Sequence, residues 1–213
     1  MHEKVPIFQH SSTERIVMIV DLTKPLDEHL AIYTEDAYSD PPFQIETWCT
    51  VANQGYRVAR LALGTQTGTH IDAPAHFLDG GSELDLLPVD ALIGRYLWLN
   101  LDAAHADDLN WDGERILFLA STRPEVQISE AFFRSLLELP CRVWVITRAV
   151  TVAGREPFHF NRALAQADKF LIEDMDETAA ARVRAGGEMI ALPLNLLHAT
   201  GSPCRVIVRQ TAP

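Results

Sequence analysis

The sequence lacks a long apolar run, and none approaches the roughly 18 residues that a membrane-spanning helix needs. Its first fifteen residues, MHEKVPIFQHSSTER, also lack the apolar core of a secretory signal. Only three cysteines occur, Cys49, Cys141 and Cys204, and no two of them form a CxxC pair. An odd, scattered set of this kind is typical of free thiols in a reducing compartment. We therefore expect a cytoplasmic protein with no membrane partner.

Basic residues are also scarce, because 18 Lys and Arg stand against 29 Asp and Glu and give a net charge of −11. Nucleic acids and anionic lipids bind basic surfaces, so neither is an expected partner. The Gly-Gly pair at residues 80–81 reads as a turn, because no helix-opening glycine fingerprint surrounds it. The chain also has no internal repeat, low-complexity tract or linker. These absences leave a small-molecule substrate as the expected partner.

What the sequence does contain is a series of short apolar runs separated by amphipathic segments. The runs at residues 15–22, 95–101, 115–120 and 142–147 predict buried strands. Residues 129–139 predict a helix, because Ser129 is a good N-cap and apolar residues follow at helical spacing. The chain of 213 residues with 47% apolar content suits one α/β domain. We expect a strand-rich core flanked by helices over residues 15–213, preceded by a loose polar arm at 1–14.

Three further segments bear on the site. Residues 44–51 and 56–63 predict two strands joined by a hairpin-like turn at 52–55. Residues 169–172 predict a buried strand that leads to Glu173. Residues 177–185 predict a helix ended by the Gly-Gly pair at 186–187.

The most informative segment is residues 66–76, which read Gln-Thr-Gly-Thr-His-Ile-Asp-Ala-Pro-Ala-His. Residues two apart in an extended chain point to the same side, so His70, Asp72 and His76 should share a face, together with Gln66. Imidazole nitrogen and carboxylate oxygen are the usual ligands of zinc, manganese and iron. The segment therefore predicts a polar cluster with the chemistry of a metal site.

This segment resembles the signature of the cyclase-like metal-dependent hydrolases, a family that includes bacterial kynurenine formamidases and isatin hydrolases. The family pattern is His-x-Gly-Thr-His-x-Asp-x-Pro-x-His, and Gln66 stands at the position of its first His. Residues 22–26 (LTKPL) and 87–94 (LPVDALIG) are similar to other parts of the family. Residues 161–173 match a helix-then-strand unit in which relatives carry a ligand His at the position of Asn161 and a ligand Glu at Glu173.

The resemblance implies a role for each matched residue. His70 and Asp72 would bind a divalent metal, manganese or zinc, and Glu173 would be a further ligand. Gln66 and Asn161 would be weaker ligands, and His76 would be the general acid/base. The implied fold is the swivelling β/β/α fold of the family, and the implied assembly is a homodimer or homotetramer. The implied reaction is hydrolysis of a small amide, a formamide or a lactam.

The two substituted ligand positions leave three hypotheses open. The first is a working hydrolase with a single or weakly held metal, in which His159 could replace a missing ligand. The second is a metal-free enzyme that uses His70, Asp72, His76 and Glu173 for acid/base chemistry. The third is a catalytically degraded relative that binds a small ligand or a partner.

The remaining candidate residues each have a structural alternative. Trp48 and Phe77 could line an aromatic substrate pocket or pack in the core. Glu173 could be held in a salt bridge to Arg148 or Arg162 rather than bind a metal.

Overall fold

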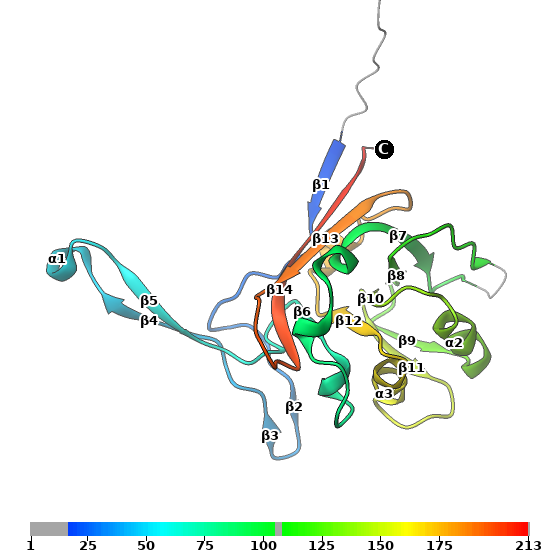
Figure 1. Cartoon of the computed structure of the whole chain (residues 1–213), viewed down its shortest axis with the longest axis horizontal. Helices are drawn as coiled ribbons and strands as arrows, with labels where there is room; N and C mark the ends of the chain where they lie inside the picture. The colour runs from blue at the N-terminus through cyan, green and yellow to red at the C-terminus, as the bar shows by residue number, and fades with distance from the viewer. Residues whose placement is uncertain (1–16, 105–107, 213) are drawn as a thin grey trace, which may run out of the picture.

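The strands of the core join in one sheet that closes on itself. The computed structural model describes residues 17–104 and 108–212 (Figure 1), so the expected N-terminal arm at 1–14 lies outside the described residues. The strand order is β1 (Val17–Asp21), β14 (Gly201–Thr211), β13 (Glu188–Pro193), β7 (Ile93–Asn100), β8 (Ile116–Ala120), β10 (Val143–Ile146), β12 (Phe170–Glu173) and β6 (His70–Asp72). Because β6 pairs with both β12 and β14, every strand of this sheet except β1 belongs to a closed ring. The expected single domain with a strand-rich core is confirmed.

The four neighbouring strands β7, β8, β10 and β12 run parallel and have apolar side chains on both faces. On β10, Val143 and Val145 face the interior of the ring, while Trp144 and Ile146 face the helices α2 (Glu130–Leu137) and α3 (His159–Gln166). Both faces are buried, which explains why these strands read as unbroken apolar runs. The two helices lie side by side on one flank of the sheet (Figure 1).

One predicted helix is confirmed, and another is shorter than predicted. Ser129 caps α2 by accepting a hydrogen bond from the Phe132 N–H, so that prediction is confirmed. The helix expected over 177–185 is wrong in length, because α4 (Glu177–Ala180) makes a single turn. The chain leaves the helical path because the Arg184 N–H donates to Gln210 Oε1 and the Arg184 carbonyl accepts from Tyr96. These long-range bonds are not visible in the local sequence.

Two predicted strands leave the body as a hairpin. β4 (Gln44–Cys49) and β5 (Val58–Ala62) pair antiparallel, and Figure 1 shows them projecting far to one side. The expected turn at 52–55 is instead a one-turn helix, α1 (Val51–Gln54), which ends at Gly55 with φ 79°. We call residues 44–62 the β4–β5 ribbon.

The remaining elements are short. β2 (Thr34–Glu35) pairs with β3 (Tyr38–Ser39), and β9 (Glu125–Ile128) pairs with β11 (Ala149–Val152). Three 3-10 turns follow β6, namely η1 (Pro74–His76), η2 (Leu84–Leu86) and η3 (Val89–Leu92). In the part of the chain that the structure describes, no helix is long and apolar enough to cross a membrane.

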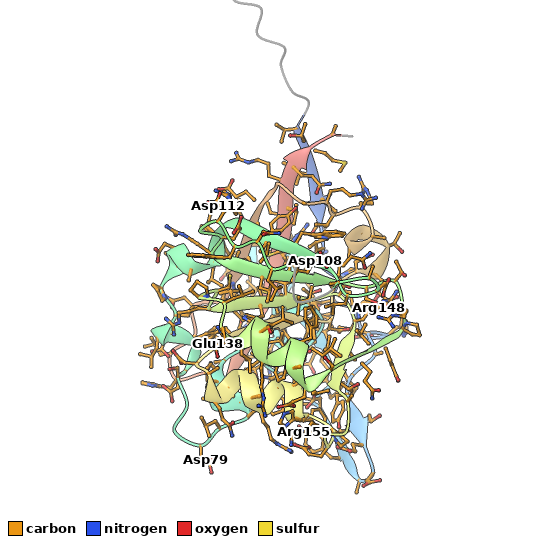
Figure 2. The ribbon with its side chains drawn as sticks, turned by 90° about the vertical axis from the view of Figure 1, so that its right-hand side faces the viewer. Asp79, Asp108, Asp112, Glu138, Arg148 and Arg155 are labelled. Carbon is orange, nitrogen blue, oxygen red and sulfur yellow. The ribbon has the colours of Figure 1, made fainter. Side chains whose placement is uncertain are left out.

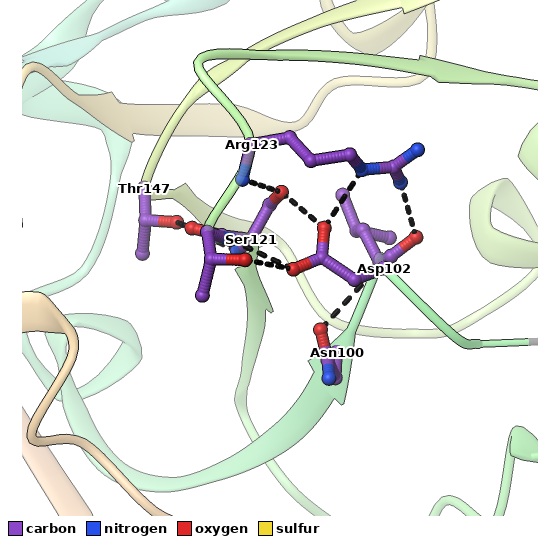
Figure 3. A network of polar contacts seen from close by, with 7 residues as sticks. Asn100, Asp102, Ser121, Arg123 and Thr147 are labelled. Atoms are coloured by element: carbon purple, nitrogen blue, oxygen red, sulfur yellow. Dashed lines mark hydrogen bonds and ion pairs between the residues drawn. The ribbon is translucent and has the colours of Figure 1, made fainter.

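A polar network ties together the ends of β7, β8 and β10 (Figure 3). The Asp102 carboxylate accepts hydrogen bonds from Ser121 Oγ at 2.5 Å, Thr122 N at 2.9 Å, Thr122 Oγ1 at 2.6 Å and Arg123 Nε at 2.9 Å. Thr147, which follows β10, joins the network because its Oγ1 accepts from the Ser121 N–H. The hydrogen bonds from Ser121 and Thr122, and then Arg123, hold the pKa of Asp102 far below its usual range.

We expect Asp102→Asn to destabilise the fold by about 2–4 kcal/mol, since hydrogen bonds to a charged group contribute about 1.5–3 kcal/mol each and are not additive. Because the folded-state pKa of Asp102 is depressed, its contribution is present above pH ~4 and is lost as pH falls further. Urea unfolding at pH 7 and at pH 3 measures both effects. The matched control is Asp112→Asn, because Asp112 is an exposed carboxylate at the edge of the molecule (Figure 2) and pairs with Arg95. A loss from Asp112→Asn as large as that from Asp102→Asn would contradict the prediction.

Candidate metal centre

Three predicted ligands converge beside β6. His70 Nε2 lies 3.5 Å from Asp72 Oδ1 and 3.5 Å from Glu173 Oε1. His70 and Asp72 are the first and last residues of β6, so the alternation of the strand puts them on one face. Glu173 is the last residue of β12, and the antiparallel register sets it opposite His70. Side chains about a hundred positions apart are thereby held within reach of one cation.

A backbone carbonyl fixes the orientation of the His70 ring. Its Nδ1 lies 2.7 Å from the Gly68 carbonyl, an acceptor that requires a proton on Nδ1 and leaves Nε2 to face the two carboxylates. Gly68 has φ +63°, and a Cβ there would lie 2.6 Å from Leu26 Cδ2. The backbone conformation therefore requires the glycine of the motif, and a Cβ there would in addition displace the Leu26 side chain.

The charges of the centre depend on one another. Burial alone would lower the pKa of His70, but its hydrogen bond to Glu173 and the charge of Asp72 raise that pKa to about 9. Burial raises the pKa of Asp72 to about 7, although the positive charge on His70 opposes the shift. In the absence of a metal, protonated His70 therefore supplies the positive charge between the carboxylates of Asp72 and Glu173.

One oxygen of Asp72 has no hydrogen-bond partner among the described residues. Asp72 Oδ2 is buried, and the residue is 4% exposed. A buried unpartnered carboxylate oxygen is costly, and binding of a cation would remove that cost. Asp72 also borders a cavity of about 10 Å³ that is lined by Phe77 and Asn161 among others. Asn161, one of the two predicted weak ligands, therefore lines the same cavity as Asp72.

Gln66 presents its amide nitrogen to the centre rather than its oxygen. Gln66 Nε2 lies 3.4 Å from Asp72 Oδ1 and 3.4 Å from His76 Nδ1, while Gln66 Oε1 accepts from Thr65 Oγ1 at 2.5 Å. Asp72 can only accept when it is ionised, which supports this orientation of the amide. Ligation of a cation by Gln66 would require the side-chain amide to flip, so that Oε1 rather than Nε2 faces Asp72.

His76 lies beside the cluster because the chain turns, and not because it continues the extended strand as predicted. The chain is extended only over β6, and η1 then turns His76 back beside Gln66. The grouping predicted from the motif is right, but the shared strand face ends at Asp72. Partial burial and the charge of His70 lower the pKa of His76, which favours a neutral imidazole. Its ring packs edge-on against Phe77, with centroids 4.6 Å apart.

Four other candidate side chains make their contacts away from this centre. Arg148 pairs with Glu177 and Arg162 with Glu156, so neither arginine holds Glu173. His159 faces α2, where its Nε2 lies 3.7 Å from Glu130 Oε2 and its ring packs on Phe133, so it does not replace a ligand. Trp48 is 72% exposed near the outer end of β4, on the ribbon that leaves the body, and does not line its own chain's site.

Sequence analysis missed an aromatic row beside His76. Phe158 lies 5.9 Å from Phe77 and 6.2 Å from Tyr33, measured between ring centroids. Phe158 has φ +63°, a strained conformation for a residue with a side chain, and such strain clusters at functional sites. The local sequence Pro-Phe-His gives no signal of either property.

Comparison with known proteins agrees with this geometry. Residues 20–130 match the model of the family described as "Putative cyclase". A kynurenine formamidase from Bacillus cytotoxicus is 27% identical over 205 residues, covering 89% of this chain and 96% of the relative. A kynurenine formamidase from Bacillus cereus is 29% identical over 211 residues, with the same coverage.

Solved structures share the fold. Isatin hydrolase A from Labrenzia aggregata, bound to benzyl benzoate, superposes with a TM-score of 0.76 at 20% identity, covering 92% of this chain and 94% of that one. A structure described as a potential metal-dependent hydrolase with cyclase activity gives a TM-score of 0.70 at 22% identity, covering 93% and 100%. Because the family model spans more than half of the sequence, this chain belongs to the cyclase family.

Proposed function

We propose that this chain is a metal-dependent hydrolase of a small amide, either a formamide or a lactam. The observation that carries the proposal is the convergence of His70, Asp72 and Glu173 within reach of one cation, together with the second oxygen of the buried Asp72 carboxylate, which lacks a partner. The kynurenine formamidase relatives support the formamide as substrate class.

The donor set fits one divalent cation. Donors at 2.0–2.1 Å from a tetrahedral metal lie roughly 3.3 Å apart, close to the two distances of 3.5 Å that His70 makes here. One imidazole and two carboxylates suit zinc or manganese, which we propose as the metal. Such a cation, when bound, would polarise a carbonyl oxygen and lower the pKa of a water molecule.

The other residues of the centre handle protons and position the substrate. His76 is held neutral by its lowered pKa, so it can accept a proton from an attacking water and return it to the leaving nitrogen. The amide of Gln66 positions His76 and Asp72 relative to each other. Phe77, Phe158 and Tyr33 offer an aromatic surface next to His76, which favours an aromatic amide.

The metal-free and degraded alternatives have less support. The unpartnered oxygen of Asp72 is costly to bury unless a cation binds it, which a degraded relative without metal would not provide. The contact with the Gly68 carbonyl also fixes the His70 tautomer that suits metal ligation. Metal-free acid/base chemistry would use the same residues without a need for three converging donors.

The test combines metal content with hydrolysis. Protein purified without tag or chelator should hold about one equivalent of metal per chain and should hydrolyse some members of a panel of N-formyl arylamines and lactams. Chelator should abolish the rate, and Zn²⁺ or Mn²⁺ should restore it. A rate that survives chelation but is lost in His76→Ala would favour the metal-free alternative. No rate under any condition would reject the hydrolase.

Introducing histidine at both positions that depart from the family pattern, Gln66 and Asn161, should strengthen zinc binding. Gln66→His and Asn161→His together would add two imidazoles next to Asp72, and an imidazole nitrogen is a better ligand for zinc than an amide. We expect the zinc affinity to rise by at least ~10-fold, as judged by competition with a chromophoric chelator. The control is Gln66→Asn with Asn161→Gln, which adds no imidazole. Equal zinc affinity in the two double variants would contradict the prediction.

A cytoplasmic location also belongs to the proposal. Cys49, Cys141 and Cys204 are all buried and free. Free thiols are typical of proteins kept in a reducing compartment.

A further inference from the structure

A side-chain hydroxyl joins the strands β6 and β12 at the point where their backbone pairing ends. The last residues paired there are His70 and Glu173. The next residues across are Thr69 and Asp174, which lie beyond the register of the two strands. There the Thr69 hydroxyl donates to the Asp174 carbonyl, with 2.9 Å between the two oxygens. One hydroxyl thus links the residue before one candidate ligand to the residue after another.

The position of the Thr69 hydroxyl is itself fixed. Thr69 is 1% exposed. Its Oγ1 accepts from the Lys24 N–H at 3.0 Å while it donates to Asp174, so the only proton of the hydroxyl is already used. The Thr69 carbonyl accepts from the Cys204 N–H on β14 at 2.9 Å. The hydroxyl therefore cannot turn without breaking a buried hydrogen bond.

Asp174 needs such support because its backbone is left-handed. Its φ is +58°, a conformation that costs free energy for a residue with a side chain, although aspartate adopts it more readily than most residues do. Strain of this kind persists only where the surroundings impose it, and it clusters at functional sites. Here Thr69 binds the carbonyl of Asp174, and Lys24 forms an ion pair with its carboxylate. The chain therefore makes a defined bend immediately after Glu173.

Glu173 depends on its backbone more than the other two ligands do. Its side chain is 28% exposed, whereas those of His70 and Asp72 are 7% and 5% exposed. Close packing therefore does not confine the Glu173 carboxylate as it confines the other two groups. What holds Glu173 is the pairing with β6 on one side and the bend at Asp174 on the other.

We propose that Thr69 is a positioning residue of the metal centre. Through Asp174, its hydroxyl holds Glu173 where that carboxylate completes the set of donors with His70 and Asp72. Thr69 acts through Glu173 and not on the cation itself. The effect on a cation rests on the proposed function, whereas the position of Glu173 relative to His70 does not.

Metal affinity and dissociation test the role of the hydroxyl. Thr69→Val keeps the shape of the side chain, and it should weaken Mn²⁺ binding by ~10–100-fold, as loss of groups that support ligands does, mainly through faster dissociation. Thr69→Ser keeps the hydroxyl and should bind Mn²⁺ as the wild type does. The matched control is Thr67→Val, which should also bind as the wild type does, since Thr67 is 3% exposed in the same segment and bonds Gly64 through its backbone N–H.

Stopped-flow mixing of the Mn²⁺-loaded proteins with a chelator measures the dissociation rate, and thermal unfolding measures the stability. A residue that only stabilises the fold would lower the Tm of Thr69→Val and leave the dissociation rate unchanged. That result, or an equal loss of affinity in Thr67→Val, would overturn the proposal.

A second pair of variants leaves the buried threonine in place. Asp174→Asn and Asp174→Ala both remove the carboxylate that pairs with Lys24, but asparagine adopts a positive φ more readily than alanine. Asp174 is exposed, so both variants should fold. Asp174→Ala should release Mn²⁺ faster than Asp174→Asn. Equal rates in the two variants would show that the bend does not position Glu173.

Crystal structures of the metal-free variants decide the proposal even if the wild type binds no metal. The distance of 3.5 Å between His70 Nε2 and Glu173 Oε1 should be kept in Thr69→Ser. In Thr69→Val, Glu173 should move away from His70 and this distance should increase. A wild type that binds no metal contradicts the proposed function. An unchanged distance in Thr69→Val contradicts the positioning role of Thr69.

Discussion

Glu173→Gln should abolish tight metal binding and amide hydrolysis while leaving the protein folded. The amide keeps the shape of the carboxylate and its oxygen can still accept a hydrogen bond from protonated His70 Nε2, but it removes one of the two negative charges that face that nitrogen. Loss of groups that merely support ligands costs ~10–100-fold in metal affinity, so removal of a direct ligand should cost more than ~100-fold.

The measurement for Glu173→Gln is metal affinity by competition with a chromophoric chelator, together with kcat/KM for the best amide. The control is His198→Ala, because His198, Glu83 and Asp85 also lie close enough to one another to hold a metal but His198 is exposed. His198→Ala should leave both quantities unchanged. If Glu173→Gln keeps stoichiometric tight metal, or if His198→Ala removes it, the cation is not bound where we place it.

Metal binding should strengthen by about tenfold per pH unit between pH 7 and 9. In the metal-free protein His70 binds a proton up to a pKa of about 9, and a metal must displace that proton to reach Nε2. Below pH 7 the protonation of Asp72, whose pKa is raised to about 7, should make the dependence steeper still. Titration with Mn²⁺ in non-coordinating buffers at pH 6, 7, 8 and 9 measures this dependence.

The stability of the metal-free protein should change in the opposite sense. The folded-state pKa of His70 lies above its ordinary value of 6.5, so its stabilising effect is complete below that value and is lost as pH rises through about 9. The pKa of Asp72 is also raised, so the cost of its buried charge grows from pH ~4 to about 7. The rise in melting temperature caused by Mn²⁺ should therefore grow with pH. A metal affinity independent of pH would contradict a site that includes His70.

The part of the site that the sequence predicts is the part that lies on one strand. The alternation of an extended chain places His70 and Asp72 on one face, and β6 obeys it. Glu173 could be proposed only from the resemblance, because its meeting with His70 depends on the antiparallel register of β6 and β12, which local patterns do not specify. The amide orientation of Gln66 depends on Thr65 and Asp72 together, so sequence alone could not assign it.

The same limit applies to the fold. Strands buried on both faces were predictable, because their apolar runs are continuous. The closure of the ring was not, since it depends on β14 and β12 both pairing with a strand of three residues. The helix expected over 177–185 ends early because Arg184 forms hydrogen bonds with Tyr96 on β7 and Gln210 on β14.

The double pairing of β6 also bears on how fast a cation could leave. His70 and Asp72 sit on a strand that is hydrogen-bonded on both sides, so they cannot move apart by fraying of an edge. Their side chains are 7% and 5% exposed, whereas that of Glu173 is 28% exposed. Glu173 is therefore the ligand that would move most easily, and its rotation away from His70 would set the residence time of a bound cation.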